Sequence, residues 1–460
     1  MRALAALLSR LPRPTVRGWG LLVTGAAMLV AMEVLQRREF SFVALLVLAL
    51  PVVAAIGVSL YSAPLTIERR FDPELAPAGS DVSVRLLVRN WGSLSSPEAA
   101  FFDRVSGPLE AAGRSRLPRM PGFRASIHDA PVPLSLGYRL EARHRGRHAV
   151  GPFVLLLSDP FALVVRRLAI GTTDTLTVTP STTLLPRGAV RLATGAGADQ
   201  VSRQLGGAGE QDVISRKYQT GDSMRRVNWP ATARFGELMV RQDDQQSDQN
   251  SIVLLDTAAA SFGLEAQHDG APGTAHTFSA EFEWAVSMSA SIGLHLLAEG
   301  FHVQLVTSAD AVVDSALRTR GPGGSAQHPG PVSTRFEPNG GEEALLLHAA
   351  QLDLIDAWET DFRLALSRSD AVVGELPPVF AVVGQLGDAS AQALASAARY
   401  SSGAVAIVVT EPLSPGVRAP RWATGLCEVL EAGGWSAQCV GSDEAPAAAW
   451  GATGAERFVL

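Results

Sequence analysis

The stretch Ser251-Ile252-Val253-Leu254-Leu255-Asp256 decides the fold class of the C-terminal half of this chain. Four consecutive apolar residues followed by a carboxylate are typical of a strand that is buried on both faces, as in a parallel sheet. Further apolar strands follow, and amphipathic helices separate them. The predicted strands are Ile252–Leu255, His302–Val306, Val379–Val383, Ala404–Val409 and Ser436–Val440, and the predicted helices include Phe278–Leu296, Ser390–Tyr400 and Gly425–Ala432. This alternation predicts a doubly wound α/β domain over residues 251–460, with helices on both faces of a parallel sheet.

One segment inside this domain lacks the pattern of regular structure. Residues 320–341 contain four prolines and many glycines. Such composition favours a surface loop, so we expect Arg320–Gly341 to contain no strand or helix.

Residues 64–185 show the alternation of half-buried strands. Residues 82–88 place apolar side chains at every second position and end before an Asn90-Trp91-Gly92 turn. Residues 138–142 and 175–179 repeat the pattern. Turn-rich stretches between such strands predict an all-β sandwich, with spacing or recognition as its role.

Two histidines in this region have a spacing that is also found in metal sites. His144 and His148 are four residues apart, and on a helix they would face one metal ion. Gly146 and the flanking alternation predict a hairpin instead. We therefore expect solvated or hydrogen-bonded histidines.

The N-terminal region predicts a transmembrane hairpin over residues 18–61, preceded by a basic segment over residues 1–17. Gly18–Leu35 and Phe40–Tyr61 are apolar runs joined by Gln36-Arg37-Arg38-Glu39. At about 1.5 Å per residue, roughly 20 residues cross the hydrocarbon core, so both runs are long enough. A cleavable signal peptide is disfavoured because the second run follows at once.

The arginines around this hairpin predict its orientation. They are Arg2, Arg10, Arg13 and Arg17 before it, Arg37 and Arg38 within it, and Arg69 and Arg70 after it. The outer flanks hold more positive charge than the loop. The positive-inside rule therefore predicts that both termini and the large C-terminal domains are cytoplasmic. The membrane that we expect the hairpin to span is the plasma membrane.

Composition excludes several classes of function. The net charge of −6 and the pI near 5.9 disfavour a nucleic-acid-binding protein, which would present a basic face. Lys217 is the only lysine, and no Gly-Lys-Ser/Thr sequence occurs, so a Walker-type phosphate loop is excluded. Cys427 and Cys439 are the only cysteines, which excludes a disulfide framework but leaves a single bridge open, and their spacing is not that of metal ligands.

Residues 186–250 form a linker and a segment crowded with structurally demanding residues. The segment contains Tyr218, Gly221, Asp222, Arg225, Arg226, Asn228, Trp229, Thr232 and Arg234. Gly221 suits a turn, Asp222 can cap the next helix, and Arg225, Trp229 and Thr232 recur at helical spacing. This face is either a buried clasp between sheet and helix, in which Trp229 and Asp222 are structural, or a surface that docks a partner. In the second case Arg226 and Arg234 are the better candidates for contact.

This segment and several others resemble the bacterial domain-of-unknown-function-58 family. The resemblance also covers Leu238–Arg241, Arg145–His148, Gly151-Pro152 and Asp159-Pro160-Phe161. Ala162 departs from the family, which has glycine there, and a reshaped turn is expected. The resemblance implies a membrane-anchored protein with a von Willebrand factor A-like C-terminal domain. It also implies partners, a MoxR-type AAA+ ATPase and a transglutaminase-like membrane protein, but no known activity.

Von Willebrand factor A-like domains commonly hold magnesium through an Asp-x-Ser-x-Ser motif at the end of the first strand. Here that motif begins with Asp256 but has Ala258 and Ala260 at both serine positions. Since Mg²⁺ requires a nearly complete set of oxygen ligands, we expect no metal and no cofactor, with Asp256 kept as a turn or cap residue.

Two functions remain open on the sequence alone. The favoured one is a membrane-tethered scaffold that binds protein partners, because it needs only a tether, a β module and an α/β domain. The alternative is an enzyme, a hydrolase with a site near Asp222 and Asp256. No Gly-x-Ser-x-Gly elbow supports the alternative, and no catalytic residue is assigned.

Overall fold

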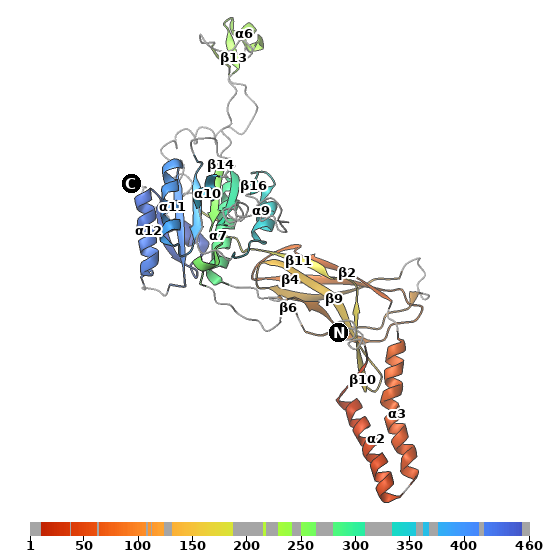
Figure 1. Ribbon diagram of the computed structural model, residues 1–460. Coiled ribbons are helices and arrows are strands. Elements are labelled where there is room, and N and C mark those ends of the chain that lie inside the picture. The colour runs from red at the N-terminus through yellow and green to blue at the C-terminus, as the bar shows by residue number, and fades with distance from the viewer. Residues whose placement is uncertain are drawn as a thin grey trace, which may run out of the picture. The chain divides into compact units, whose positions relative to one another are not determined.

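The computed structural model of the chain divides into two compact units, Met1–Ser181 and Thr182–Leu460 (Figure 1). It describes residues 11–36, 38–61, 64–106, 109–111, 113–123, 131–186, 215–217, 229–241, 250–263, 279–308, 334–355, 362–367, 376–413 and 418–452.

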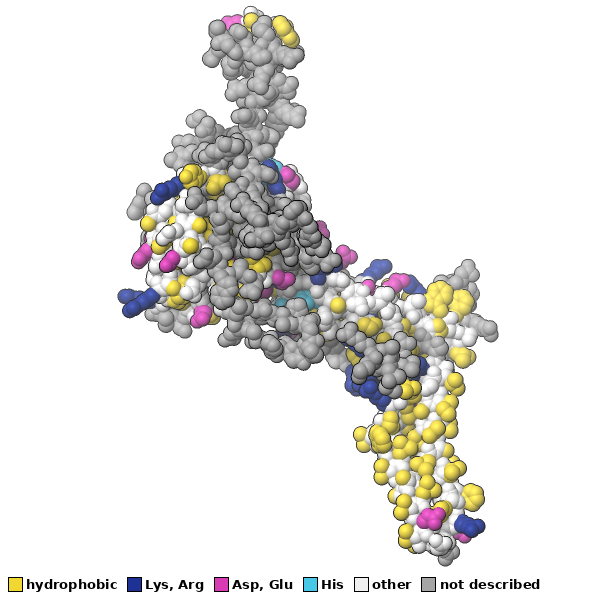
Figure 2. All heavy atoms as spheres, viewed as in Figure 1, with side chains coloured by type: hydrophobic (Ala, Val, Ile, Leu, Met, Phe, Trp, Pro, Cys, Tyr) yellow, Lys and Arg dark blue, Asp and Glu magenta, His cyan; other side chains and the backbone are white. Residues whose placement is uncertain are grey.

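Two long apolar helices begin the first unit. They are α2, Val16–Leu35, and α3, Glu39–Leu60, with mean hydropathies of 1.7 and 2.7. Only 11% and 17% of their most apolar windows are buried, so their side chains face outward as a yellow surface in Figure 2. Gly25 of α2 packs closely on α3, since a Cβ there would lie 2.6 Å from the Leu48 side chain. Length and composition are compatible with the two predicted membrane spans.

The remainder of this unit is built from two β-sheets. One contains, among the described residues, β1 (Arg13–Pro14), β10 (Val164–Ile170), β9 (Gly146–Ser158), β11 (Asp174–Thr179) and β3 (Leu75–Pro77) in that order, with β5 (Ala99–Val105) on β9 and β7 (Ser115–Leu117) on β5. The other has the order β2 (Leu65–Asp72), β4 (Ser80–Asn90), β8 (Leu134–Ala142) and β6 (Leu109–Ala111). Apolar residues of both sheets form one buried cluster. The alternation predicted for residues 82–88 is confirmed, because every second side chain of β4 is buried.

The predicted hairpin around Gly146 is wrong. Strand β8 pairs with β4 and β6, whereas β9 pairs with β5, β10 and β11, so the turn carries the chain from one sheet to the other. Local alternation could not reveal this change of partner. His148 is buried and its Nε2 lies 2.8 Å from the His144 carbonyl oxygen, in keeping with a hydrogen-bonded histidine.

A buried charge network joins the two sheets. Arg69 of β2 donates Nε and Nη2 to the two carboxylate oxygens of Asp103 of β5, at 3.0 and 2.7 Å, and Nη1 to Asp174 of β11 at 2.8 Å. The Tyr138 hydroxyl donates to Asp103 at 2.6 Å. Burial lowers the pKa of Arg69, but its bonds to Asp103 and Asp174 more than offset this and raise it. Burial, helped by Asp103, raises the pKa of Tyr138.

The second unit contains the α/β sheet predicted from the sequence. Its order, over the described strands, is β16 (Thr334–Phe336), β15 (His302–Thr307), β14 (Asn250–Leu255), β17 (Val379–Val383), β18 (Ala404–Thr410) and β19 (Ser436–Gly441). All neighbours are parallel except β15 and β16. Consecutive residues of β14 enter separate clusters: Val253 packs on one face, and Ile252 packs on the other.

Helices cover both faces of this sheet, as predicted. The first cluster includes residues of α7 (Ala280–Ala298), α9 (Gly341–Ala349) and α13 (Pro446–Ala452). The second includes residues of α10 (Phe362–Ser367), α11 (Asp388–Ala397) and α12 (Arg421–Gly433). Cys427 of α12 and Cys439 of β19 are free thiols with sulfur atoms 2.8 Å apart.

The prediction that residues 320–341 contain no strand is wrong for its end. Thr334–Phe336 pair antiparallel with β15 as the edge strand β16. Phe336 lies opposite Val303 and is buried in the first cluster. The strand is only three residues long, too short for an alternation to be visible in the sequence.

Candidate functional site

The carboxyl edge of the α/β sheet has a topological switch point at Asp256. In chain order the strands run 3-2-1-4-5-6, so β14 is flanked by β15 on one side and by β17 on the other. The connection after β14 leads to β15 and the connection after β17 leads to β18, in opposite directions, which opens the edge between β14 and β17. Ligands of doubly wound sheets bind beyond the carboxyl ends of strands at such a point.

Asp256 is completely buried there and its carboxylate is held by two donors. Oδ1 accepts a hydrogen bond from the Ser308 hydroxyl at 2.7 Å and from the Ala258 amide at 3.0 Å. The bond to residue i+2 confirms Asp256 as a turn residue. Sequence reasoning missed Ser308, although one signal was present. Ser308 directly follows β15 as Asp256 follows β14, and parallel neighbours in register bring both to one edge.

Two oxygen atoms at this edge are buried without a hydrogen-bond partner in the described part of the chain, Asp256 Oδ2 and Thr257 Oγ1. Burial raises the pKa of Asp256, while the hydrogen bonds from the Ala258 amide and the Ser308 hydroxyl act in the opposite direction. Gly384 must be glycine because a Cβ would lie 2.1 Å from the Ser261 carbonyl oxygen. The loop after β14 thus closes tightly against the end of β17.

This donor set does not fit magnesium. Mg²⁺ requires near-octahedral oxygen coordination at about 2.0 to 2.1 Å. Asp256 Oδ1 is already engaged, and Ala258 and Ala260 supply no side-chain oxygen. No cluster of three acidic, histidine or cysteine side chains occurs in the described ranges. Asp256 Oδ2 and Thr257 Oγ1 are too few to complete such a site.

The segment singled out in the sequence is described only in part. Strands β12 (Ser215–Lys217) and β13 (Met239–Arg241) pair antiparallel, and α6 (Trp229–Phe235) lies between them in the chain. Thr232 of α6 accepts the Met239 amide at 3.0 Å, which ties the helix to β13. Tyr218, Gly221, Asp222, Arg225, Arg226 and Asn228 lie outside the described residues.

Trp229 is not buried as the expected clasp between sheet and helix would require. Its side chain is 62% exposed, and Arg234 is exposed as well. A tryptophan that belonged to a packed clasp would be largely covered. This exposure opposes the structural role expected for Trp229.

The Asp159-Pro160-Phe161 motif forms the turn between β9 and β10. Asp159 accepts the Phe161 amide at 3.0 Å through Oδ2 and the Val164 amide at 2.7 Å through Oδ1. Ala162 has a φ of 54° and so adopts the left-handed conformation that suits glycine. Alanine is thus accommodated at a residue where its Cβ is disfavoured.

Residues 214–320 match the family model described as "Protein of unknown function DUF58". This match supports the DUF58 family for that segment of the chain. The DUF58 match contains β12, α6, β13 and Asp256, and it confirms the resemblance drawn from the sequence. No curated protein matches the chain.

Several solved structures match parts of this chain at low similarity. The CARDB domain of a Pyrococcus furiosus protein matches at 14% identity and a TM-score of 0.19, over 26% of this chain and 98% of that one. A complex of zinc 2-glycoprotein and prolactin inducible protein from human seminal plasma matches at 15% identity and 0.17, over 24% and 92%. A Paenibacillus cycloisomaltooligosaccharide glucanotransferase matches at 11% identity and 0.17, over 82% and 53%. TM-scores this low carry no argument about fold or function.

Proposed function

We propose that this protein is a membrane-tethered scaffold that acts with a MoxR-type AAA+ ATPase in the assembly or maintenance of a membrane or envelope complex. The observation that supports it best is the way both apolar helices are hydrogen-bonded to β10 and to the two residues just before it. A tether built only to localise a domain needs no such junction, whereas a scaffold that holds its domain at a set distance from the bilayer does.

Strand β10 and the two residues before it contact the near end of each helix. Thr15, the N-cap of α2, donates its amide to the Leu163 carbonyl at 2.8 Å and its hydroxyl to the Ala162 carbonyl at 2.6 Å. Arg166 donates Nη1 to the last carbonyls of α3, those of Val58, Ser59 and Tyr61, at 3.0 to 3.1 Å. Helix ends leave such carbonyls without partners inside the helix, so Arg166 acts as a C-cap.

The second unit supplies the partner-binding part of the proposal. A doubly wound order supports the von Willebrand factor A-like assignment, and two sheets on one core support a β-sandwich in the first unit. Exposed Trp229 and Arg234 are residue types that dominate protein interfaces, which favours the DUF58 segment as the docking surface. A transglutaminase-like membrane protein is a second expected partner.

The proposed orientation places the β-domain in the cytoplasm of a bacterial cell. Arg13, Arg17, Arg166 and Arg167 all lie at the end of the helical hairpin that meets the β-domain. Positive charge on the cytoplasmic flank is the expected arrangement. A cysteine introduced at Arg38, after replacement of Cys427 and Cys439 by serine, should react with an impermeant maleimide in intact cells. If the maleimide labels a Tyr400→Cys variant in intact cells and does not label the Arg38 variant, the orientation is opposite to the one proposed.

Capture of the ATPase tests the docking surface. The full chain in detergent should retain the MoxR-type ATPase of the same organism, and Trp229→Ala and Arg234→Ala should each weaken retention at least tenfold. Tyr400→Ala is the matched control, since this exposed aromatic residue lies outside the DUF58 match. Equal retention by all variants would remove the proposed role of the segment.

One observation favours the alternative, a hydrolase with a site near Asp222 and Asp256. Oδ2 of Asp256 is buried and has no hydrogen-bond partner among the described residues. A buried carboxyl with a raised pKa is suited to proton transfer. Its complete burial opposes this role, because a substrate cannot reach it without movement of the loop after β14. Turnover of ester or phosphate substrates that Asp256→Asn abolishes, with an unchanged melting temperature, would favour the enzyme.

A further inference from the structure

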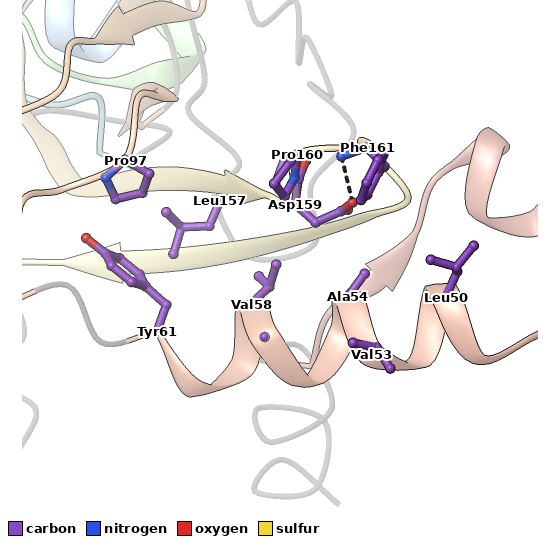
Figure 3. Close-up of a pocket in the computed structure, with 12 residues that line it drawn as sticks. Leu50, Val53, Ala54, Val58, Tyr61, Pro97, Leu157, Asp159, Pro160 and Phe161 are labelled. Atoms are coloured by element: carbon purple, nitrogen blue, oxygen red, sulfur yellow. Dashed lines mark hydrogen bonds between the residues drawn. The ribbon is translucent and has the colours of Figure 1, made fainter. Parts of the chain in front are cut away.

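An apolar groove of about 390 Å³ lies between α3 and the turn of the β9–β10 hairpin (Figure 3). Its floor is one side of α3, and its opposite wall is Leu157 with the Asp159-Pro160-Phe161 turn. The α3 residues that line it are Leu50, Val53, Ala54, Gly57 and Val58, with Tyr61 directly after the helix. Figure 3 shows Leu50, Ala54, Val58 and Tyr61 on the side that faces the hairpin.

The position of the groove along α3 places it at the boundary of the proposed membrane span. Gly25 of α2 contacts Ala44 and Leu48 of α3, whose midpoint is residue 46. The helices are antiparallel, so Val16, nine residues before Gly25, is level with about residue 55 of α3. The start of α2 marks one end of the span common to both helices (Figure 1). Leu50 and Ala54 therefore lie within the hydrocarbon layer, and Tyr61 lies beyond it.

The exposed turn residue next to the groove has the character of an interfacial anchor. Phe161 is 66% exposed although it is large and apolar. Aromatic side chains are enriched where headgroups meet hydrocarbon. Trp19 of α2, three residues after the start of that helix, is also exposed. Both aromatic residues thus occur near the level at which the groove crosses the boundary.

The mouth of the groove carries a cation that has no ion-pair partner among the described residues. Arg166 donates to the carbonyls of Val58 and Tyr61, which line the groove, and no carboxylate among the described residues pairs with it. Asp159 also lines the groove, but both of its oxygens accept amides of its own turn. Figure 2 shows basic side chains where the helices meet the β-domain. Such clusters attract anionic lipid.

We propose that this groove binds one acyl chain of an anionic phospholipid, with the lipid phosphate beside Arg166. Apolar walls within the hydrocarbon layer suit the chain, and a cationic group at the boundary suits the phosphate. The inference rests on the proposed membrane insertion of α2 and α3. A bound lipid would fill the space between α3 and the hairpin and so complete the junction that orients the β-domain.

Two glycines provide a matched pair of variants for the test. A Cβ added at Gly57 or at Gly20 meets no atom within 4 Å, so both positions accept a larger side chain. Gly57 lines the groove, and Gly20 of α2 does not. Gly57→Leu therefore fills the groove, while Gly20→Leu adds the same apolar group elsewhere. Arg166→Gln and Arg167→Gln form the corresponding pair for charge, since Arg167 is the exposed neighbour in β10.

Native mass spectrometry of the full chain, released from vesicles of equal phosphatidylglycerol and phosphatidylcholine, measures the bound lipid. The wild type and Gly20→Leu should carry one phosphatidylglycerol per chain, and Gly57→Leu should carry at least tenfold less. Arg166→Gln should bind both lipids equally, whereas Arg167→Gln should keep the preference. Equal lipid in both leucine variants, or a second copy of the chain in place of lipid, overturns the proposal.

Flotation of the same vesicles separates this inference from the proposed function. Protein that fails to float with the vesicles after carbonate washing contradicts the membrane tether itself. Protein that floats but shows no lipid preference or no loss in Gly57→Leu contradicts only the lipid site.

Discussion

The Arg69 network offers the sharpest prediction, because one arginine has two carboxylate partners in different surroundings. The side chains of Arg69 and Asp103 are fully buried, whereas that of Asp174 is 40% exposed. Replacing each aspartate by asparagine removes one charge and keeps the size of the side chain. The pair of variants therefore compares a buried partner with an exposed one around the same cation.

Asp103→Asn should lower the free energy of unfolding of the first unit by roughly 3 to 5 kcal/mol, because it leaves the buried guanidinium charge without its main partner. The asparagine amide also places donors against Arg69, and it weakens the acceptor of the Tyr138 hydroxyl. Asp174→Asn should cost about 0 to 1 kcal/mol, since the partner is solvated. Nη1 of Arg69 then still donates to the Thr172 carbonyl at 2.9 Å.

Native-state hydrogen exchange of the full chain in detergent, read by mass spectrometry on peptides of β4 and β9, reports this free energy without isolating the unit. Tyr138→Phe should fall between the two variants, at about 1.5 to 3 kcal/mol, because it removes one bond to a charged acceptor. If Asp103→Asn and Asp174→Asn differ by less than about 1 kcal/mol, burial does not control the strength of this network and the reasoning fails.

Three further outcomes follow from single residues. Ala162→Gly should stabilise the first unit by about 1 kcal/mol because φ is positive there, and Ala169→Gly in β10, the control, should destabilise it. Millimolar Mg²⁺ or EDTA should not shift the melting temperature of the second unit, since a site at about 100 times its dissociation constant would add roughly 2.7 kcal/mol. Asp256 has a pKa raised above 3.8, so its contribution to stability is present below that pH and is lost as pH rises through the folded pKa. In melts across this range, Asp256→Asn should remove that part of the pH dependence.

The sequence predicted those features that depend on periodicity over many residues. The buried strand Ile252–Leu255 and the alternation of residues 82–88 were both confirmed, since a core face imposes its period on a long element. Strand β16 was not predicted from the sequence because three residues are too few to show a period. The exposure of Trp229 was not predicted either, because helical spacing groups residues on a face without showing what covers that face.

Contacts between distant residues decide what the periodicity leaves open. Ser308 and Asp256 are 52 residues apart, and Arg166 and Val58 are 108 apart, yet each pair forms a hydrogen bond. Such partners are brought together by strand order and by the docking of helices, which local propensity does not encode. The Asp159-Pro160-Phe161 turn illustrates the consequence. The family resemblance implied a turn there, but its position beside α3, and hence its place in the wall of the apolar groove, follows only from the three-dimensional structure.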